Sequence, residues 1–236
     1  MRLSVVVFLR SDIFYHIQRR APEQDKLPIQ RITWDDPEML LRVLDRRLVY
    51  ATGGRLSELD IWKQFFAKDV NGVPSREFIT STVIHRPRDI IYFVKEAMSD
   101  AVNRGHTLVE EDDFYSARHR YSQMAIKSVV AEDDPQRGKL KAVLVAFSRG
   151  EKVLTRTQVE GRIRLVVAEE SEVPYYLELL CDVGFLGIET PAGFRYPTDE
   201  GERDLLLEVA RNAAKNGGKD EVFRINDAFY DGLQIQ

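Results

Sequence analysis

Residues 85–105, HRPRDIIYFVKEAMSDAVNRG, decide the fold class of the chain. Their apolar residues recur at helical spacing, and Pro87 suits the first turn of a helix. Asp89 stands where a carboxylate balances the positive end of the helix dipole, and Gly105 is a residue type that commonly ends a helix. The stretch therefore predicts a long amphipathic helix from Pro87 to about Gly105.

Helical patterns continue upstream and downstream of this stretch. Asp36 caps a predicted helix that has Pro37 in its first turn and ends at Gly53-Gly54. Further helices are predicted over residues 57–67, 75–84 and 112–131. This part of the chain is predicted to be a helical domain.

The pattern changes after a predicted linker at residues 133–138. Thr155 and Gln158 match a capping box, and Gly184 stands in a C-terminal capping position. Short helices are predicted over residues 139–147, 155–168 and 173–183, followed by a hairpin over 185–196. This order is the outline of a winged helix. A helix over 199–215 and a strand over 221–225 are predicted to follow.

Residues 3–9, LSVVVFL, are apolar and rich in β-branched side chains, without alternation. Such a run is typical of a strand buried on both faces of a parallel sheet, and residues 29–33 predict a second short strand. Two strands cannot form a sheet with both faces covered. We therefore expect the remaining strands to come from another chain or from a part of the protein upstream.

Together these patterns predict a mainly α (α+β) fold. Its three parts are the remnant of a parallel α/β sheet, a helical lid and a C-terminal winged-helix domain. The predicted domain boundaries are residues 1–54, 55–132 and 136–236.

Composition limits the class of protein. The 236 residues carry a formal net charge of −4, with 44% hydrophobic and 31% charged residues, as is typical of a globular protein without a global basic excess. Cys181 is the one cysteine, which fits a reducing compartment. No apolar run approaches the roughly 20 residues of a membrane helix. A cytoplasmic location without membrane attachment is expected.

Motifs for independent catalysis are absent from the sequence. It contains no G-x-x-x-x-G-K-[ST] loop to cradle a triphosphate, and no apolar strand that ends in paired acidic residues to hold Mg²⁺. Its histidines and cysteine lack metal-ligand spacing, and no nucleophile–base pair is recognisable. We therefore expect no catalytic residue, no metal site and no nucleotide hydrolysis by this chain alone.

Two short segments are candidate phosphate-binding sites. Arg10, Ser11 and Asp12 follow the predicted strand at its carboxyl end, where open α/β sheets bind ligands. Arg86 and Arg88 flank Pro87 at a helix N-terminus, which attracts anions that arginine can bind through forked hydrogen bonds. The alternative is that the first segment only marks the exit of a strand, and that the arginines of the second point into water.

Several segments resemble the later part of a bacterial P-loop ATPase of the AAA/STAND type. Residues 5–13 resemble the sensor-1 strand, whose polar end reads the γ-phosphate, and residues 86–91 resemble the lid motif that contacts adenine and phosphate. Residues 223–229 are similar to the close of the winged-helix domain in related ATPases. The resemblance implies nucleotide contacts by Arg10, Asp12, Arg86, Pro87 and Arg88. It implies ATP and Mg²⁺ only where an upstream nucleotide core is present.

The function predicted from these observations is a non-catalytic regulatory module. It would sense nucleotide, bind a protein partner or an upstream ATPase core, and act in signalling or antiphage defence, with homo-oligomerisation as an option. A second hypothesis is a winged-helix DNA-binding protein whose residues 173–183 read the major groove, although Glu178 and Asp182 there would repel phosphates. A third is a protein-interaction domain without a ligand of its own.

Overall fold

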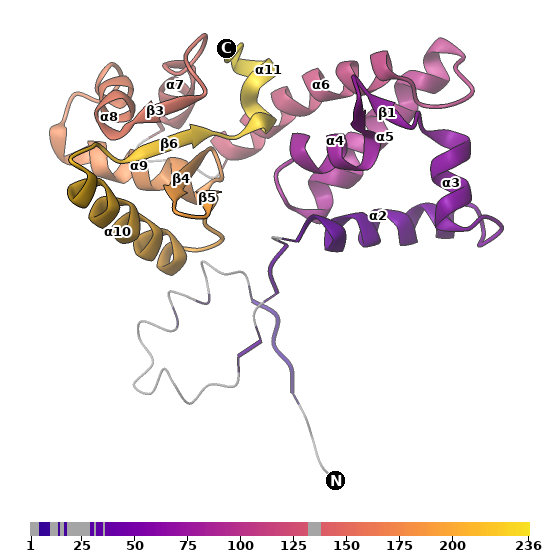
Figure 1. The fold of residues 1–236 in the computed structure, drawn as a ribbon, viewed down its shortest axis with the longest axis horizontal. Coiled ribbons are helices and arrows are strands. Elements are labelled where there is room, and N and C mark those ends of the chain that lie inside the picture. Colours follow the sequence, from indigo (N-terminus) through magenta and orange to yellow (C-terminus); the bar gives the residue numbers. More distant parts are fainter. Residues whose placement is uncertain are drawn as a thin grey trace.

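The computed structural model describes residues 5–9, 14, 17, 29–30, 32–34, 36–131 and 138–236. These residues are mainly helical, with one two-stranded and one four-stranded antiparallel sheet, which confirms the predicted α+β class. Figure 1 shows a helical lobe, residues 36–131, beside a lobe that contains the larger sheet, residues 138–236. Helix α6 (Glu111–Val130) reaches from the first lobe to the second.

The predicted buried strand at residues 3–9 is wrong for the part that the structure describes. Residues 5–9 form no strand, and the side chains of Val5, Val6, Val7 and Phe8 are at least 68% exposed. The described residues of the 29–33 run form no strand either. β-branched residues favour a strand only where a neighbouring strand and a packed face are available, and both observed sheets are antiparallel. Arg10 and Asp12 lie outside the described residues.

The helical lobe contains a short hairpin among its helices. Its elements are α2 (Pro37–Ala51), α3 (Glu58–Phe65), β1 (Asp69–Val70), β2 (Val73–Pro74), α4 (Ser75–Thr82), α5 (Pro87–Arg104) and α6. Asp36 accepts a hydrogen bond from the Glu38 N–H and so caps α2 as predicted. The hairpin was not predicted from the sequence. Its two turn residues, Asn71 and Gly72, both have positive φ, as a tight hairpin turn requires.

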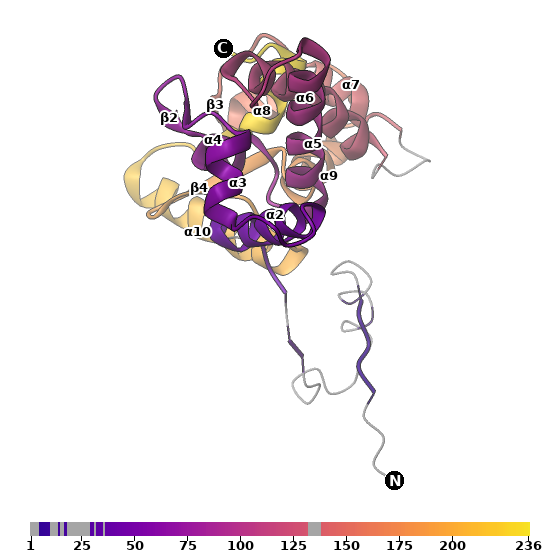
Figure 2. The same ribbon diagram turned by 90° about the vertical axis from the view of Figure 1, so that its right-hand side faces the viewer.

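Aromatic side chains from three helices form the centre of this lobe. Phe93 of α5 stacks on Phe114 of α6 at 6.4 Å between ring centroids, and Phe78 of α4 meets Phe114 edge-on at 5.9 Å. Helix α2 adds Leu40 and Leu44, both buried, and packs against α3, α4 and α5. The predicted boundary at residue 54 therefore falls between helices that pack together. Figure 2, which faces this lobe, shows α5 between α2 and α6.

A buried carboxylate ties α2 to the two helices that follow it. Asp45 of α2 is 3% exposed and accepts a hydrogen bond from Trp62 Nε1 at 2.7 Å. Arg76 of α4 donates to both Asp45 oxygens, each at 3.1 Å, and its guanidinium lies 4.9 Å from the centre of the Trp62 ring. The cluster of Asp45, Trp62 and Arg76 thereby fixes the relative positions of α2, α3 and α4.

The second lobe combines short helices with the four-stranded sheet. Its elements are α7 (Leu140–Val145), β3 (Val153–Thr155), α8 (Arg156–Arg164), η2 (Glu170–Glu172), α9 (Val173–Asp182), β4 (Leu186–Thr190), β5 (Gly193–Arg195), α10 (Glu200–Gly217), β6 (Val222–Ile225), η3 (Asp227–Phe229) and α11 (Tyr230–Leu233). The strand order is β3-β6-β4-β5, so the last strand enters the sheet between two earlier ones.

Most predicted elements of the second lobe are present. The Thr155–Gln158 capping box starts α8, and β4 and β5 form the predicted hairpin. Helix α8 ends at Arg164, earlier than predicted, and β3 was missed. Helix α10 separates the hairpin from β6, so the strand that completes the sheet follows a helical insertion. Assignment of this lobe as a winged helix stays a prediction.

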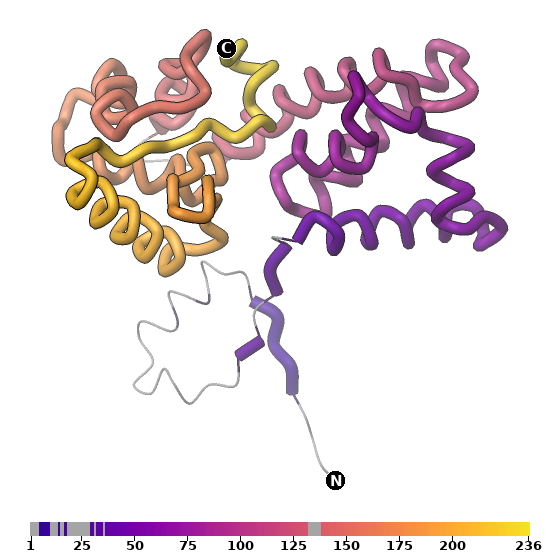
Figure 3. Tube along the Cα trace, viewed as in Figure 1, coloured from indigo at the N-terminus to yellow at the C-terminus, as the bar shows by residue number. Residues whose placement is uncertain are grey.

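The end of the chain returns to α6 and joins the two lobes, as the yellow segment of Figure 3 shows. The Gly232 N–H donates to Ser122 Oγ at 2.8 Å, and Arg118 Nε lies 2.9 Å from Asp231 Oδ2. A Cβ atom at position 232 would lie 2.6 Å from Ile126 Cδ1 and 2.9 Å from Ser122 Oγ, so only glycine allows this approach. The contact of α11 with α6 is therefore close and hydrogen-bonded.

The connection between α5 and α6 contains an ion-paired histidine. Asp113 is fully buried and lies 2.8 Å from His106 Nδ1 and 2.9 Å from Arg104 Nη1. The hydrogen bond to Asp113 raises the pKa of His106, with the charges of Asp113 and Glu110 adding to it. Burial opposes ionisation of Asp113, but the His106 and Glu110 N–H hydrogen bonds and the nearby positive charges lower its pKa overall.

This pair predicts a pH-dependent stability. Because the folded-state pKa of His106 is raised, its stabilising contribution is complete below about pH 6.5 and is lost as the pH rises through the folded value. Since the pKa of Asp113 is lowered, its contribution is lost only under acidic conditions. We expect the free energy of unfolding, measured with urea, to fall as the pH rises from about 6 to 9.

The histidine responsible can be identified by substitution. His106→Gln is expected to flatten the fall in stability above neutral pH. His119→Gln is the matched control, because His119 is exposed on α6, the helix that follows His106, and forms no ion pair with a described residue. An unchanged pH profile in His106→Gln would contradict the assignment.

Candidate functional site

The predicted segment around Arg86 and Arg88 lies at the junction of α4 and α5. Arg86 has an extended backbone (φ −133°, ψ 137°) and is the N-cap of α5, and Pro87 occupies the first turn as predicted. The Arg86 carbonyl accepts the first helical hydrogen bond, from the Asp89 N–H at 3.0 Å. No side-chain hydrogen bond caps this helix end, which carries the Arg86 and Arg88 side chains on either side of Pro87.

A buried tyrosine holds the segment in place. Tyr121 of α6 is fully buried, and its hydroxyl accepts a hydrogen bond from the Ile84 N–H at 2.9 Å. The same hydroxyl donates to Asp89 Oδ1 at 3.0 Å, and Asp89 is only 2% exposed. One side chain therefore anchors Ile84, two residues before Arg86, and Asp89, directly after Arg88.

The carboxylate of Asp89 and the guanidinium groups of Arg86 and Arg88 place opposite charges at the start of α5. Burial raises the pKa of Asp89, while the Tyr121 hydrogen bond and the charges of Arg86 and Arg88 act in the opposite direction. Arg88 Nε lies 3.4 Å from Asp89 Oδ2, and the Arg88 side chain is 63% exposed. The two arginines thus favour the ionised form of Asp89, as does the helix start, but burial outweighs them and its pKa stays above the usual value.

The structure describes three of the five residues of the predicted site. Arg86, Pro87 and Arg88 are consecutive at one helix start, but Arg10 and Asp12 are outside the described residues, so their approach to this site stays a prediction. Tyr121 was missed because it belongs to another helix. Its place on the buried face of α6, with Phe114, Ala117 and Ala125, made it indistinguishable from an ordinary core residue.

Loss of the Tyr121 hydroxyl should measurably weaken this anchor. Tyr121→Phe leaves the Ile84 N–H and the Asp89 carboxylate without their partner, and we expect the free energy of unfolding to fall by about 2 kcal/mol. Tyr92→Phe is the control, because the partly buried Tyr92 makes no hydrogen bond through its hydroxyl within the described residues. Urea denaturation of both variants checks the prediction. Equal stabilities would show that the hydroxyl contributes nothing.

Chemistry elsewhere in the described residues is sparse. They contain no group of three histidine, cysteine, aspartate or glutamate side chains placed to hold a metal ion. Cys181 is fully buried in α9, and burial raises the pKa of its thiol, which suppresses the reactive thiolate. Among the same residues, no helix combines the length and apolar composition needed to cross a membrane.

Helix α9 is the helix that the DNA-binding hypothesis places in the major groove. Five of its residues are buried: Val173, Tyr176, Leu177, Leu180 and Cys181. Its acidic residues, Glu178 and Asp182, are ion-paired with Arg203 of α10, which packs against α9. Burial raises the pKa of Asp182 to about 6, although Arg203 opposes this shift. A helix that is covered and carries no basic residue is poorly suited to reading a DNA groove.

Comparison with known protein families finds a match for part of the chain. Residues 38–130 match the FunZ-associated C-terminal helical domain. The match begins within α2, ends at the last residue of α6 and includes the Arg86–Asp89 segment. No curated protein and no solved structure matches the chain. The helical lobe is therefore similar to a helical domain that is described as C-terminal.

Proposed function

We propose that this chain is an accessory, non-catalytic module that contacts the nucleotide-bearing core of an ATPase through Arg86, Pro87 and Arg88. The carrying observation is the arginine pair at the start of α5, anchored from behind by Tyr121 and Asp89. Similarity of residues 38–130 to a C-terminal helical domain supports a role beside another domain. Signalling or antiphage defence is the setting that the P-loop ATPase resemblance suggests.

The physical basis of the proposal is electrostatic. A bound nucleotide carries a concentrated negative charge, and guanidinium groups at a helix N-terminus bind phosphate oxygens through charge-assisted hydrogen bonds. Arg86 and Arg88 would contact the phosphates, and ATP with Mg²⁺ would be held by a phosphate loop that this sequence does not contain. The chain would then respond to a nucleotide that another polypeptide segment holds.

A route from this site to the second lobe supports a regulatory role. Tyr121 couples the start of α5 to α6, and α6 contacts α11 through the Ser122–Gly232 hydrogen bond. A displacement of α5 that moved Tyr121 would act on the same helix that carries the second lobe. The proposed output is a change in how this lobe binds a protein partner or another copy of the chain.

The decisive test is binding of a fluorescent ATP analogue to a mixture of this chain and the protein encoded immediately upstream. We expect Arg88→Ala to weaken this binding at least about tenfold, the loss typical of one charge-assisted contact. Arg42→Ala is the matched control, because Arg42 is exposed on α2. The proposal fails if Arg88→Ala leaves binding unchanged, or if the purified chain alone turns over ATP at an ordinary enzymatic rate.

A further inference from the structure

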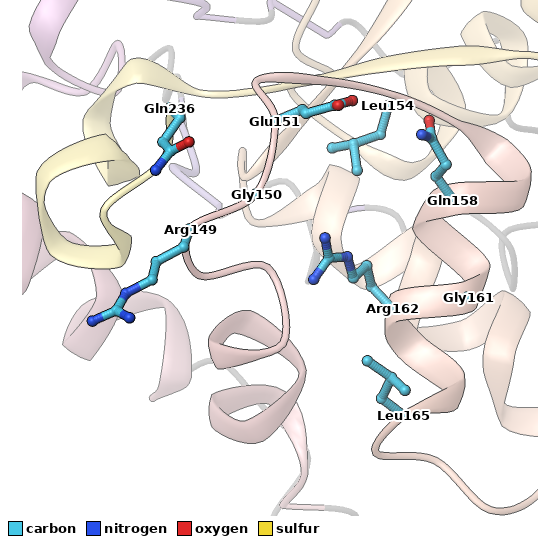
Figure 4. A pocket seen from close by; sticks show the side chains of 9 residues that line it. All are labelled: Arg149, Gly150, Glu151, Leu154, Gln158, Gly161, Arg162, Leu165 and Gln236. Atoms are coloured by element: carbon cyan, nitrogen blue, oxygen red, sulfur yellow. The ribbon is translucent and has the colours of Figure 1, made fainter.

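A pocket of about 580 Å³ opens in the second lobe, far in sequence from the arginines of α5. Figure 4 shows its walls, which come from α8, from the loop before β3 and from Gln236. Backbone hydrogen bonds fix these walls together. The Gln236 N–H donates to the Gly150 carbonyl at 3.0 Å, and the Arg149 N–H donates to the Leu233 carbonyl at 3.0 Å. Backbone hydrogen bonds therefore fix the 149–150 wall of the pocket against the wall that contains Gln236.

The arginines of this lobe fall into two groups. Residues 138–236 contain eight arginines, and six of them form ion pairs with aspartate or glutamate: Arg156, Arg164, Arg195, Arg203, Arg211 and Arg224. The other two, Arg149 and Arg162, form no ion pair with any described residue, and both line the pocket. The two arginines of the lobe without a carboxylate among the described residues thus both line this pocket, and in Figure 4 the Arg149 side chain points away from Arg162.

Neutral acceptors hold both of these side chains. Arg162 Nη1 donates to the Ala146 carbonyl at 3.0 Å, and Arg149 Nε donates to Gln234 Oε1 at 3.0 Å. A guanidinium has five N–H donors, so each side chain is positioned while it keeps donors for a ligand. In Figure 4 the Arg162 guanidinium lies between α8 and the 149–151 loop.

The remaining lining residues define the ligand class. Among the lining side chains, Arg162 supplies a guanidinium group and Glu151 is the acidic one. A single guanidinium matches a single carboxylate, which it can bind through two parallel hydrogen bonds. Leu154 and Leu165 line the same space, and Leu165 is 74% exposed, so an apolar group beside the anion would gain burial.

We propose that this pocket binds a carboxylate group carried on a short apolar scaffold, with Arg162 as its principal partner. Two sources share this chemistry: a free organic acid, and an acidic side chain flanked by apolar residues in a peptide. The pocket belongs to the second lobe, so the proposal does not depend on nucleotide contact by Arg86 and Arg88.

The test is calorimetric titration of the full chain with two carboxylate probes and their neutral counterparts. The free-acid pair is hexanoate and hexanamide. The peptide pair is acetyl-Leu-Glu-Leu-amide and acetyl-Leu-Gln-Leu-amide. We expect at least one carboxylate to bind about tenfold or more tightly than its amide, and the pair that shows this preference identifies the source. No binding at millimolar concentration, or equal binding of acid and amide, would overturn the proposal.

Substitutions in α8 locate the binding. Arg162→Gln should weaken the preferred probe at least about tenfold. Arg164→Gln removes the same charge two positions along the helix, where the side chain is already paired with Glu160 and Glu170, and should leave binding unchanged. Equal losses in the two variants would contradict a specific role for Arg162.

A space-filling variant distinguishes the pocket from a loose surface charge. A Cβ atom at Gly161 would meet nothing within 4 Å, so Gly161→Leu can place its side chain in the pocket without a clash at its base. We expect this variant to fold, as circular dichroism would show, and to lose binding of the preferred probe. A folded Gly161→Leu that binds as well as the unchanged chain would place the ligand elsewhere.

Discussion

Replacing Asp45 by alanine is expected to lower the free energy of unfolding by about 3 kcal/mol. The carboxylate is almost wholly buried and is shared by Trp62 Nε1 and both terminal nitrogens of Arg76. Its removal leaves the indole N–H without a partner and the guanidinium without its counter-charge. Because the Arg76 side chain is 36% exposed, water can solvate it in part, which places the loss at the lower end for a buried ion pair.

Chemical denaturation of the full chain measures this effect. Glu38→Ala is the matched control, since Glu38 is 67% exposed and its oxygen lies 4.0 Å from the same Arg76 nitrogen, Nη2. An exposed pair of this kind contributes about 0–1 kcal/mol. Similar losses of unfolding free energy in Asp45→Ala and Glu38→Ala would mean that the buried carboxylate of Asp45 stabilises the fold no more than an exposed one does.

Gly232→Val is expected to cost a similar amount, about 3 kcal/mol, by forcing α11 away from α6. Ile126 Cδ1 could move aside because it ends a flexible side chain, but Ser122 Oγ is held by its hydrogen bond from the Gly232 N–H. The added methyl groups therefore overpack the contact and weaken that bond. The neighbouring Arg118–Asp231 pair would be strained as well.

The control for this substitution is Gly217→Ala at the end of α10. A Cβ atom there meets no atom within 4 Å, so the change should be neutral or slightly stabilising. Thermal unfolding of both variants, read by circular dichroism, checks the comparison. If the Gly232→Val protein were as stable as the Gly217→Ala protein, the close approach of α11 to α6 would not contribute to stability.

The helices were predictable because their signals are local. Pro87 and Gly105 delimit α5, and the Thr155–Gln158 box starts α8, with every informative residue within a turn of the helix end. The strand predicted at residues 3–9 was wrong for the described residues, because an apolar composition does not form a strand without a neighbouring strand to pair with. Both observed sheets are antiparallel, and the described residues of this run belong to neither.

Long-range pairing explains what the sequence did not reveal. The position of β6 between β3 and β4 depends on contacts across a helical insertion, and no local pattern encodes that order. The same reason applies to the candidate site. Arg86 and Arg88 could be found from one short motif. Tyr121 contacts Asp89 from 32 residues away, and its local sequence pattern is that of an ordinary core residue.

The solitary thiol of Cys181 gives the chain a built-in reporter of opening. Folded protein should react slowly with a colourimetric thiol reagent, because the sulfur is fully buried and its thiolate is suppressed. Labelling then requires the second lobe to open, so its rate follows the population of open molecules. Since Asp45 lies in the other lobe, faster labelling of Asp45→Ala would show that the two lobes unfold as one cooperative unit.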